Sequence, residues 1–264
     1  MADEPRLPLW ARPLDEPDCP DGWRVGPPDF VGVGAQRSGT TWWFRGAIRP
    51  HPGFRRPFKP LKEVHFFDRY WNEPAPPDFA ERYARLFPRP PGAITGEWTP
   101  RYMCDPWAIR MLAEAAPDAR ILIMLRDPVE RYHSGLEREA RLYEQAGTFA
   151  NIAIVGDAIY RSMYHRQVQL VLELFGREQV LVLQYERCLD DPLGEMRRTQ
   201  AFLGLEPLDE LTEKLAGPRP SRGARVGLAD AMRADLVDLF RGDVDQLAAI
   251  CPDLDLDLWP NFSG

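Results

Sequence analysis

The sequence predicts an α/β domain whose mostly parallel sheet is flanked by helices. Four short apolar runs recur along the chain, and each is followed by a segment of helical composition. One of them, 121–125, is apolar at every position, as expected of a strand that is covered on both faces. Turns that carry arginine follow the runs at 30–34 and 120–125. Because ligands of such sheets bind beyond the carboxyl ends of the strands, these two turns are the first candidates for a functional site.

The individual elements follow from apolar periodicity and from capping and breaker residues. Asp78, Asp105 and Asp127 stand where an N-cap is expected, and Gly176 stands where a helix should stop. Strands are expected at 30–34, 93–97, 120–125 and 180–185. Helices are expected at 41–49, 78–86, 106–116, from 127 onward, at 159–175, at 192–203 and at 229–250. In the last helix an apolar stripe predicts a buried face, made by Met232, Leu236, Leu239, Phe240, Leu247 and Ile250.

Length and composition favour one domain and argue against several classes of protein. The 264 residues suit a single domain at 29–264, preceded by a proline-rich surface arm at 1–28. A net charge of -7 argues against a protein that coats nucleic acid or an anionic membrane. No apolar run approaches about 18 residues and the N-terminus is acidic, so we expect a cytosolic protein without a membrane span or secretory signal. Nothing in the sequence sets the oligomeric state.

The cysteines do not indicate a metal site. All four are widely spaced, with no Cys-x-x-Cys pair and no histidine at ligand spacing. We therefore expect reduced thiols, no disulfide and no bound metal.

The turn after the first strand is the strongest functional signal. Gly34 to Thr41 nearly matches the nucleotide-binding P-loop, in which two glycines five apart are followed by Lys and then Ser or Thr. Thr40 stands where that lysine belongs, and the nearest cation, Arg37, precedes the second glycine, Gly39. Backbone N–H groups at the start of the next helix would point at one spot, which predicts a phosphate or sulfate site. The missing lysine argues against a kinase or an ATPase, which needs it to reach the outer phosphates.

Two motifs together resemble the sulfotransferases that use 3′-phosphoadenosine 5′-phosphosulfate (PAPS). Residues 36–42 (QRSGTTW) are similar to their 5′-phosphosulfate loop, and residues 126–134 (RDPVERYHS) are similar to their 3′-phosphate element. Residues 62–68 (KEVHFFD) resemble the segment that carries the catalytic glutamate in the heparan sulfate N- and 3-O-sulfotransferases. The likeness spans roughly residues 30–262 and is nearest to that branch, as a bacterial-type soluble member. It implies a three-layer, P-loop-NTPase-like fold.

The resemblance also implies a set of donor-binding residues. The amides of residues 37–42, with the hydroxyls of Ser38, Thr40 and Thr41, would hold the 5′-phosphosulfate. Arg126 and Ser134 would hold the 3′-phosphate, the group that distinguishes PAPS from ATP and that favours a planar cation. The whole implied set is Arg37, Ser38, Gly39, Thr40, Thr41, Trp42, Arg126, Ser134, Tyr185, Arg222, Gly223 and Arg225. The last three belong to a basic loop at 217–225, which a solvated surface linker explains equally well.

For the chemistry, the resemblance implies a general base at Glu63. In-line sulfuryl transfer needs an aligned acceptor, a base for its proton and cations over the leaving phosphate. If 62–68 is extended, Glu63 and His65 share one face, and partial burial would raise the pKa of Glu63 toward neutrality. His65 is the rival base, because its pKa is ordinarily near physiological pH. A structural salt bridge at a strand end explains both residues without catalysis.

Two cations complete the expected centre. Many members of the resembled family have lysine at the position of Arg37, where it stabilises the oxygen that leaves with the phosphate. Since arginine stays protonated, we assign Arg37 electrostatic stabilisation and not proton donation. Lys62 would steady the sulfate or an anionic acceptor, although a lone lysine is usually solvated.

The expected function is sulfuryl transfer from PAPS to a hydroxyl or amine of a carbohydrate or small-molecule acceptor. A P-loop nucleotide kinase and a nucleotide-binding module without turnover remain as alternatives. The sequence does not identify the acceptor. Four residues either line the acceptor side or pack in the core, namely Trp98, Arg101, Tyr102 and Tyr143.

Overall fold

The sheet is four-stranded and entirely parallel. In the computed structural model, which describes residues 14–55, 62–146, 152–217 and 227–263, the strand order is β2-β1-β3-β4. The strands are β1 (Phe30–Gly34), β2 (Gly96–Trp98), β3 (Arg120–Leu125) and β4 (Val180–Gln184). The expected α/β class is therefore confirmed. The second strand begins later than expected, because Ile94 forms an isolated bridge with Phe54 instead of joining the sheet.

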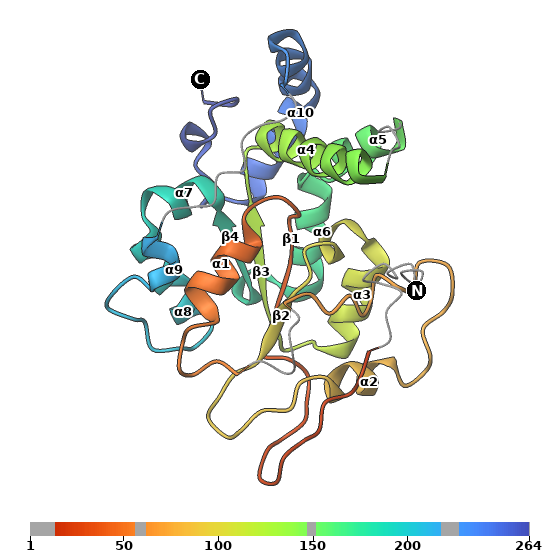
Figure 1. Ribbon diagram of the computed structural model, residues 1–264, viewed down its shortest axis with the longest axis vertical. Helices are drawn as coiled ribbons and strands as arrows, with labels where there is room; N and C mark the ends of the chain where they lie inside the picture. Colours follow the sequence, from red (N-terminus) through yellow and green to blue (C-terminus); the bar gives the residue numbers. More distant parts are fainter. Residues whose placement is uncertain (1–13, 56–61, 147–151, 218–226, 264) are drawn as a thin grey trace.

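Helices cover both faces of the sheet and the carboxyl ends of its strands (Figure 1). One face carries α1 (Thr40–Trp43), the π-helical turn η2 (Phe44–Ile48), α7 (Tyr185–Asp190), α8 (Pro192–Phe202) and α9 (Glu213–Ala216). The other face carries α2 (Phe79–Arg85), α3 (Pro106–Ala115) and α6 (His165–Phe175). Beyond the carboxyl ends lie α4 (Pro128–Ala146), α5 (Ile152–Tyr160) and α10 (Asp230–Ile250). Short 3₁₀ turns are η3 (Tyr102–Cys104), η4 (Arg177–Gln179) and η5 (Leu256–Leu258).

The central strand β3 divides the core into two apolar clusters. Ile121, Ile123 and Leu125 are buried in the cluster that includes α3 and α6. Leu122 and Met124 are buried in the opposite cluster, with α1, η2 and α8. Successive side chains of a strand point to opposite faces, so a strand covered on both sides must be apolar at successive positions. This is the physical reason for the uninterrupted run that the sequence shows at 121–125.

Two expected helices differ from the structure. The helix expected at 159–175 is two helices, α5 and α6, separated by residues 161–164. The break is stabilised from a distance, because the carboxylate of Asp243 in α10 accepts the amides of Tyr164 (2.6 Å) and His165 (3.1 Å) at the start of α6. The helix expected at 41–49 is α-helical only to Trp43 and continues as a π-helical turn.

The expected N-caps are only partly correct. Asp127 caps α4, since its Oδ1 accepts the amides of Val129 (2.9 Å) and Glu130 (3.2 Å). Asp78 and Asp105 occupy N-cap positions, but neither side chain makes a capping hydrogen bond. The Asp78 carboxylate pairs instead with Arg82 at 2.9 Å, and the Asp105 carboxylate pairs with Arg101 at 2.7 Å.

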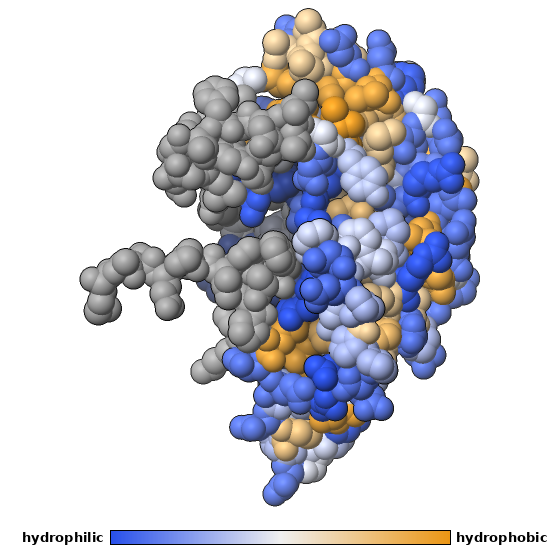
Figure 2. All heavy atoms as spheres, turned by 90° about the vertical axis from the view of Figure 1, so that its right-hand side faces the viewer, coloured by the Kyte–Doolittle hydropathy of each residue, from blue (hydrophilic) through white to orange (hydrophobic). Residues whose placement is uncertain are grey.

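The apolar stripe predicted for α10 is only partly buried. Leu236, Phe240 and Leu247 are in the core, whereas Met232 and Leu239 are 47% and 49% exposed. The face seen in Figure 2 is mostly hydrophilic, with apolar residues in several separate areas. Within the described ranges, none of the helices combines the length and apolar character that crossing a membrane requires.

Removing the cap of α8 should lower the free energy of unfolding by about 1 kcal/mol. The Asp191 carboxylate accepts the Gly194 amide at 2.9 Å, and Asp191→Ala leaves that amide without its acceptor. Urea denaturation of Asp191→Ala measures the loss, with Asp190→Ala as the neighbouring control. Equal midpoints for the two variants would contradict this assignment.

Candidate functional site

The turn after β1 forms a tight loop at the carboxyl edge of the sheet. Arg37 and Gly39 adopt left-handed backbone conformations, with φ of 71° and 87°. Gly39 is the N-cap of α1, and a Cβ at this position would lie 2.5 Å from the ring of Tyr185. Both the conformation and the close approach therefore require glycine. Amides in the first turn of any helix lack an acceptor inside that helix, which is why the sequence predicts an anion site at this loop.

Lys62 brings to this loop the lysine ammonium that the P-loop motif contains and the loop's own sequence lacks. Its Nζ donates to Thr40 Oγ1 (2.9 Å) and Thr41 Oγ1 (3.2 Å), and also to Glu63 Oε1 (3.2 Å). The side chain is 9% exposed, and Nζ lies 5.8 Å from the ring centroid of Trp98. Burial lowers the pKa of Lys62, and the Glu63 carboxylate opposes this shift. The fold, and not a local motif, places an ammonium group at the loop.

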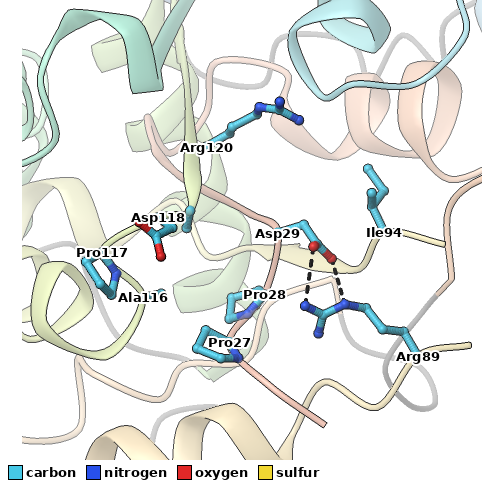
Figure 3. Close-up of a pocket in the computed structure, with 10 residues that line it drawn as sticks. Pro27, Pro28, Asp29, Arg89, Ile94, Ala116, Pro117, Asp118 and Arg120 are labelled. Atoms are coloured by element: carbon cyan, nitrogen blue, oxygen red, sulfur yellow. Dashed lines mark hydrogen bonds and ion pairs between the residues drawn. The ribbon is translucent and has the colours of Figure 1, made fainter. Parts of the chain in front are cut away.

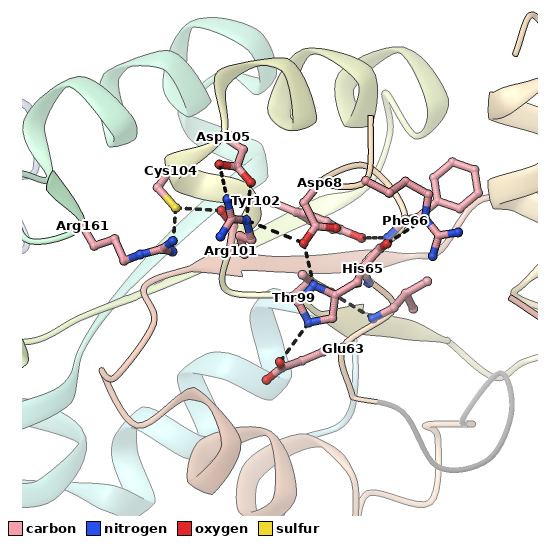
Figure 4. Close-up of polar contacts among 12 residues, drawn as sticks. Glu63, His65, Phe66, Asp68, Thr99, Arg101, Tyr102, Cys104, Asp105 and Arg161 are labelled. Atoms are coloured by element: carbon pink, nitrogen blue, oxygen red, sulfur yellow. Dashed lines mark hydrogen bonds and ion pairs between the residues drawn. The ribbon is translucent and has the colours of Figure 1, made fainter. Parts of the chain in front are cut away.

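A histidine lies between two carboxylates (Figure 4), one of which also accepts from Lys62. The Nδ1 atom of His65 is 2.6 Å from Asp68 Oδ2, and its Nε2 atom is 3.4 Å from Glu63 Oε2. Burial alone would lower the pKa of His65, but Asp68 and Glu63 outweigh it and raise this pKa to about 9. At neutral pH the ring is therefore an imidazolium ion.

The expected direction of the Glu63 pKa shift is wrong. Burial does act to raise it, but contacts with His65 and Lys62 together lower the pKa of Glu63 below its ordinary value. The carboxylate is therefore ionised at neutral pH. The segment 62–68 is also not a strand, since His65 has a left-handed backbone with φ of 54°. Glu63 and His65 nevertheless meet, as the alternation suggested.

Glu97, which the sequence did not indicate as a site residue, holds the segment 62–68 in place through buried hydrogen bonds. Its Oε2 accepts the Val64 amide (3.0 Å) and the Thr99 hydroxyl (2.5 Å). Its Oε1 accepts the hydroxyls of Tyr83 (2.9 Å) and Tyr102 (3.0 Å). Burial raises the pKa of Glu97 to about 6 against these hydrogen bonds. A carboxylate inside a short apolar strand was the available signal, because such a group needs several buried donors.

Arg37 belongs to the loop after β1, and Arg126 follows the neighbouring strand β3. The Nη2 atom of Arg37 donates to Ser134 Oγ on α4 at 3.1 Å, and Nε donates to the Ser134 carbonyl at 3.2 Å. Arg126 follows β3, and its guanidinium carbon lies 5.1 Å from the ring centroid of Tyr185. That ring contacts Trp42 edge-on, with centroids 6.2 Å apart. Arg37 therefore joins the loop to α4 through Ser134, and Arg126 reaches the loop through Tyr185.

A cavity of about 220 Å³ opens beside Glu63. Arg37, Thr40, Thr41 and Glu63 line it from the loop side, and Arg138 of α4 is among the residues opposite. Four residues that the sequence singled out thus share one cavity.

A second cavity, of about 330 Å³, lies at the amino ends of the strands (Figure 3). Asp29, Arg89 and Arg120 are among its lining residues, and Asp29 pairs with Arg89 at 2.9 Å. None of the predicted site residues lines this second cavity.

Several candidates are not brought into the site. Trp98 and Tyr102 are completely buried and pack in the core, whereas Ser38, also buried, lies within the loop itself. Arg101 pairs with Asp105 at 2.7 Å and lies 3.9 Å from Asp68. Four further candidates lie outside the described side chains, namely Tyr143, Arg222, Gly223 and Arg225.

The chain is similar in sequence to known proteins. The family model described as the sulfotransferase domain matches residues 27–217. Heparan sulfate glucosamine 3-O-sulfotransferase 3B1 of Mus musculus is 30% identical over 198 residues, which cover 71% of this chain and 48% of that protein. The bifunctional heparan sulfate N-deacetylase/N-sulfotransferase 4 of Mus musculus is 24% identical over 238 residues, with 80% and 27% covered. The chain thus spans about half the length, or less, of these curated relatives.

A solved structure also shares the fold. The sulfotransferase from Alicyclobacillus acidocaldarius superposes with a TM-score of 0.68 at 27% identity. The match covers 89% of this chain and 99% of that one.

The stability of the protein should depend on pH through His65. Its pKa is raised in the folded state from 6.5 to about 9, so its stabilising contribution is complete below pH 6.5 and is lost as the pH rises through about 9. The difference in unfolding free energy between wild type and His65→Gln should shrink by on the order of 2–3 kcal/mol over this window. Urea denaturation at several pH values measures it, with His133→Gln as the control. A difference that stays constant with pH would contradict a charged His65.

Proposed function

The chain belongs to the sulfotransferase domain family, and on that premise we propose that it moves a sulfuryl group from PAPS to a hydroxyl or amine of an acceptor. One arrangement supports this above all. The threonine hydroxyls of the loop and the Glu63 carboxylate line one cavity, and the Lys62 ammonium joins them. A site for an anionic donor and a base for an acceptor thus lie within reach of each other.

The residues of the loop fit the donor. Bound PAPS supplies an activated sulfuryl group and a doubly phosphorylated adenosine as its leaving part. The amides of α1, the two threonine hydroxyls and the Lys62 ammonium, which donates to both hydroxyls, lie together at the loop and suit an anion. Gly39 lets this backbone pack directly against Tyr185. In this proposal Arg126 and Ser134 take the 3′-phosphate.

Glu63 is the proposed general base. It is ionised at neutral pH and lines the cavity, so it can accept the acceptor's proton as the new bond to sulfur forms. His65 is a poor alternative, because with a pKa of about 9 it already carries the proton at neutral pH. We therefore assign His65 and Asp68 to holding the carboxylate in position. A low pKa makes Glu63 a weak base, which suffices when the acceptor proton becomes acidic only in the transition state.

The two cations take different parts. Lys62 donates to a loop hydroxyl and to one oxygen of Glu63, so its charge can offset that of an anionic group bound at the loop. Arg37 lines the same cavity, and its hydrogen bonds to Ser134 fix its direction. A permanently charged guanidinium there stabilises the oxygen that departs with the phosphate, without donating a proton.

The acceptor is proposed at the level of chemical class. One relative is named for 3-O-sulfation of heparan sulfate glucosamine and another for N-sulfation of heparan sulfate. These names favour a carbohydrate hydroxyl or amine, with other small molecules as the broader class. We propose that residues 29–264 form the sulfotransferase domain and that residues 1–28 are a surface arm. The Arg24–Arg89 bridge, through which the described part of this arm pairs with the domain, supports that division.

The donor proposal predicts a clear nucleotide preference. Adenosine 3′,5′-bisphosphate should bind at least about tenfold more tightly than ATP or adenosine 5′-monophosphate, because only it presents a 3′-phosphate to Arg126. Isothermal titration calorimetry measures the three affinities. Arg126→Gln should remove the preference, and Arg110→Gln on the exposed side of α3 should retain it. Preferential binding of ATP would instead favour the nucleotide kinase.

Removing the proposed base should stop turnover without emptying the donor site. Glu63→Gln should lower kcat by about 10²–10⁴-fold, while binding of adenosine 3′,5′-bisphosphate changes little. Turnover is detected by mass spectrometry as a gain of roughly 80 Da on the acceptor, the mass of SO₃. A loss of turnover without a loss of nucleotide affinity would show that Glu63 acts in the transition state and not in donor binding.

The control for this substitution is Glu81→Gln on α2, which should keep full activity. Near-normal activity of Glu63→Gln would remove Glu63 from the role of base. If wild type itself transfers no sulfuryl group to any of a broad panel of carbohydrates, amines and phenols, a nucleotide-binding module without turnover is the better description.

A further inference from the structure

One carboxylate next to Arg126 is shared between two arginines. Glu130 lies in the first turn of α4, and its Oε2 is 3.8 Å from Arg126 Nη2. Its Oε1 is only 2.6 Å from Nη1 of Arg233, which comes from the first turn of α10. All three side chains are between about a quarter and a third exposed. The strong, charge-assisted bond of Glu130 is therefore to α10, and its contact with Arg126 is the weaker one.

Arg233 is itself held in place by the carboxyl-terminal segment. Its Nη1 also donates to Asn261 Oδ1 at 2.9 Å. The backbone and side-chain nitrogens of Asn261 donate to Asp127 Oδ2 at 3.0 Å and 2.9 Å. Asp127 follows Arg126 directly and caps α4 through its other oxygen. The position of Arg233 is thus fixed relative to the same turn that carries Arg126.

The charge of Glu130 matters because of what Arg126 is proposed to bind. Burial alone would raise the pKa of Glu130, but Arg233 and then Arg126 lower it, so the carboxylate is ionised at neutral pH. An ionised carboxylate with no other partner would pair with Arg126 and would repel a phosphate dianion. The short bond to Arg233 keeps Glu130 on the α10 side, while Arg126 lies over the ring of Tyr185, which borders the loop.

We propose that Arg233 is a positioning residue of the donor site, which binds Glu130 and so keeps Arg126 available to the 3′-phosphate of the nucleotide. The proposal rests on the PAPS-dependent function proposed above. Arg233 acts through Glu130 and does not touch the nucleotide. Loss of Arg233 should therefore weaken binding of the 3′-phosphate alone, and only while Glu130 carries a charge.

A double-mutant cycle on the full chain tests this mechanism. Isothermal titration calorimetry with adenosine 3′,5′-bisphosphate and with adenosine 5′-monophosphate separates the 3′-phosphate from the rest of the nucleotide. Arg233→Gln should lower the affinity for the bisphosphate by about tenfold and change the affinity for the monophosphate by less than about twofold. Adding Glu130→Gln to Arg233→Gln should restore bisphosphate binding, because the competing charge is gone. Arg241→Gln is the matched control, since this arginine of the same helix lies 5.7 Å from the ring of Phe262.

The outcomes distinguish the inference from the function on which it rests. Equal affinity of wild type for the two nucleotides would overturn both. A wild-type preference that survives in Arg233→Gln would overturn the inference alone. So would equal weakening of both nucleotides, or a loss that Glu130→Gln does not rescue, since either indicates a merely structural role. The single variant Glu130→Gln does not depend on the folding of the arginine variant. It should bind the bisphosphate as tightly as wild type or more tightly, and a tenfold loss would overturn the inference.

Discussion

The Lys62 ammonium joins the loop after β1 (residues 36–42) to the segment 62–68, which carries the acid–base residues. Three oxygens surround it, two from loop threonines and one from Glu63. A nearly buried cation is costly unless it is paired, and here the pairing continues outward. Lys62, Glu63, His65 and Asp68 alternate in sign, with neighbouring contacts of 3.2, 3.4 and 2.6 Å. Each charge thus stabilises the next, and the array holds a carboxylate ionised at the edge of the cavity.

The scaffold explains why this array is in a fixed position. Parallel strands bring the turns after β1 and β3 to one edge of the sheet, where the loop and Arg126 both lie. Glu97, the middle residue of β2, anchors the backbone of the acid–base segment with buried hydrogen bonds. Asn261 and Arg233, from the carboxyl-terminal part of the chain, likewise hold the turn that carries Arg126. The two ends of the proposed donor site are therefore supported by separate parts of the chain.

Local sequence predicted those parts of the structure that depend on local chemistry. The strand at 121–125, the loop with Gly39 and the cap at Asp127 each follow from residue type and spacing, and the structure has them. Features that depend on distant partners were not predictable. The break before α6 needs Asp243, and the low pKa of Glu63 needs both Lys62 and a protonated His65. The place of Arg233 beside Glu130 joins residues 103 positions apart, and nothing in either segment marks it.

A crystal structure with adenosine 3′,5′-bisphosphate bound tests the central claim most directly. The account predicts that the 5′-phosphate contacts the amides of the loop and the Lys62 ammonium, with the 3′-phosphate on Arg126 and the Glu63 carboxylate facing the same cavity. A nucleotide bound instead at the amino ends of the strands, or one whose 5′-phosphate lies away from Lys62, would contradict it.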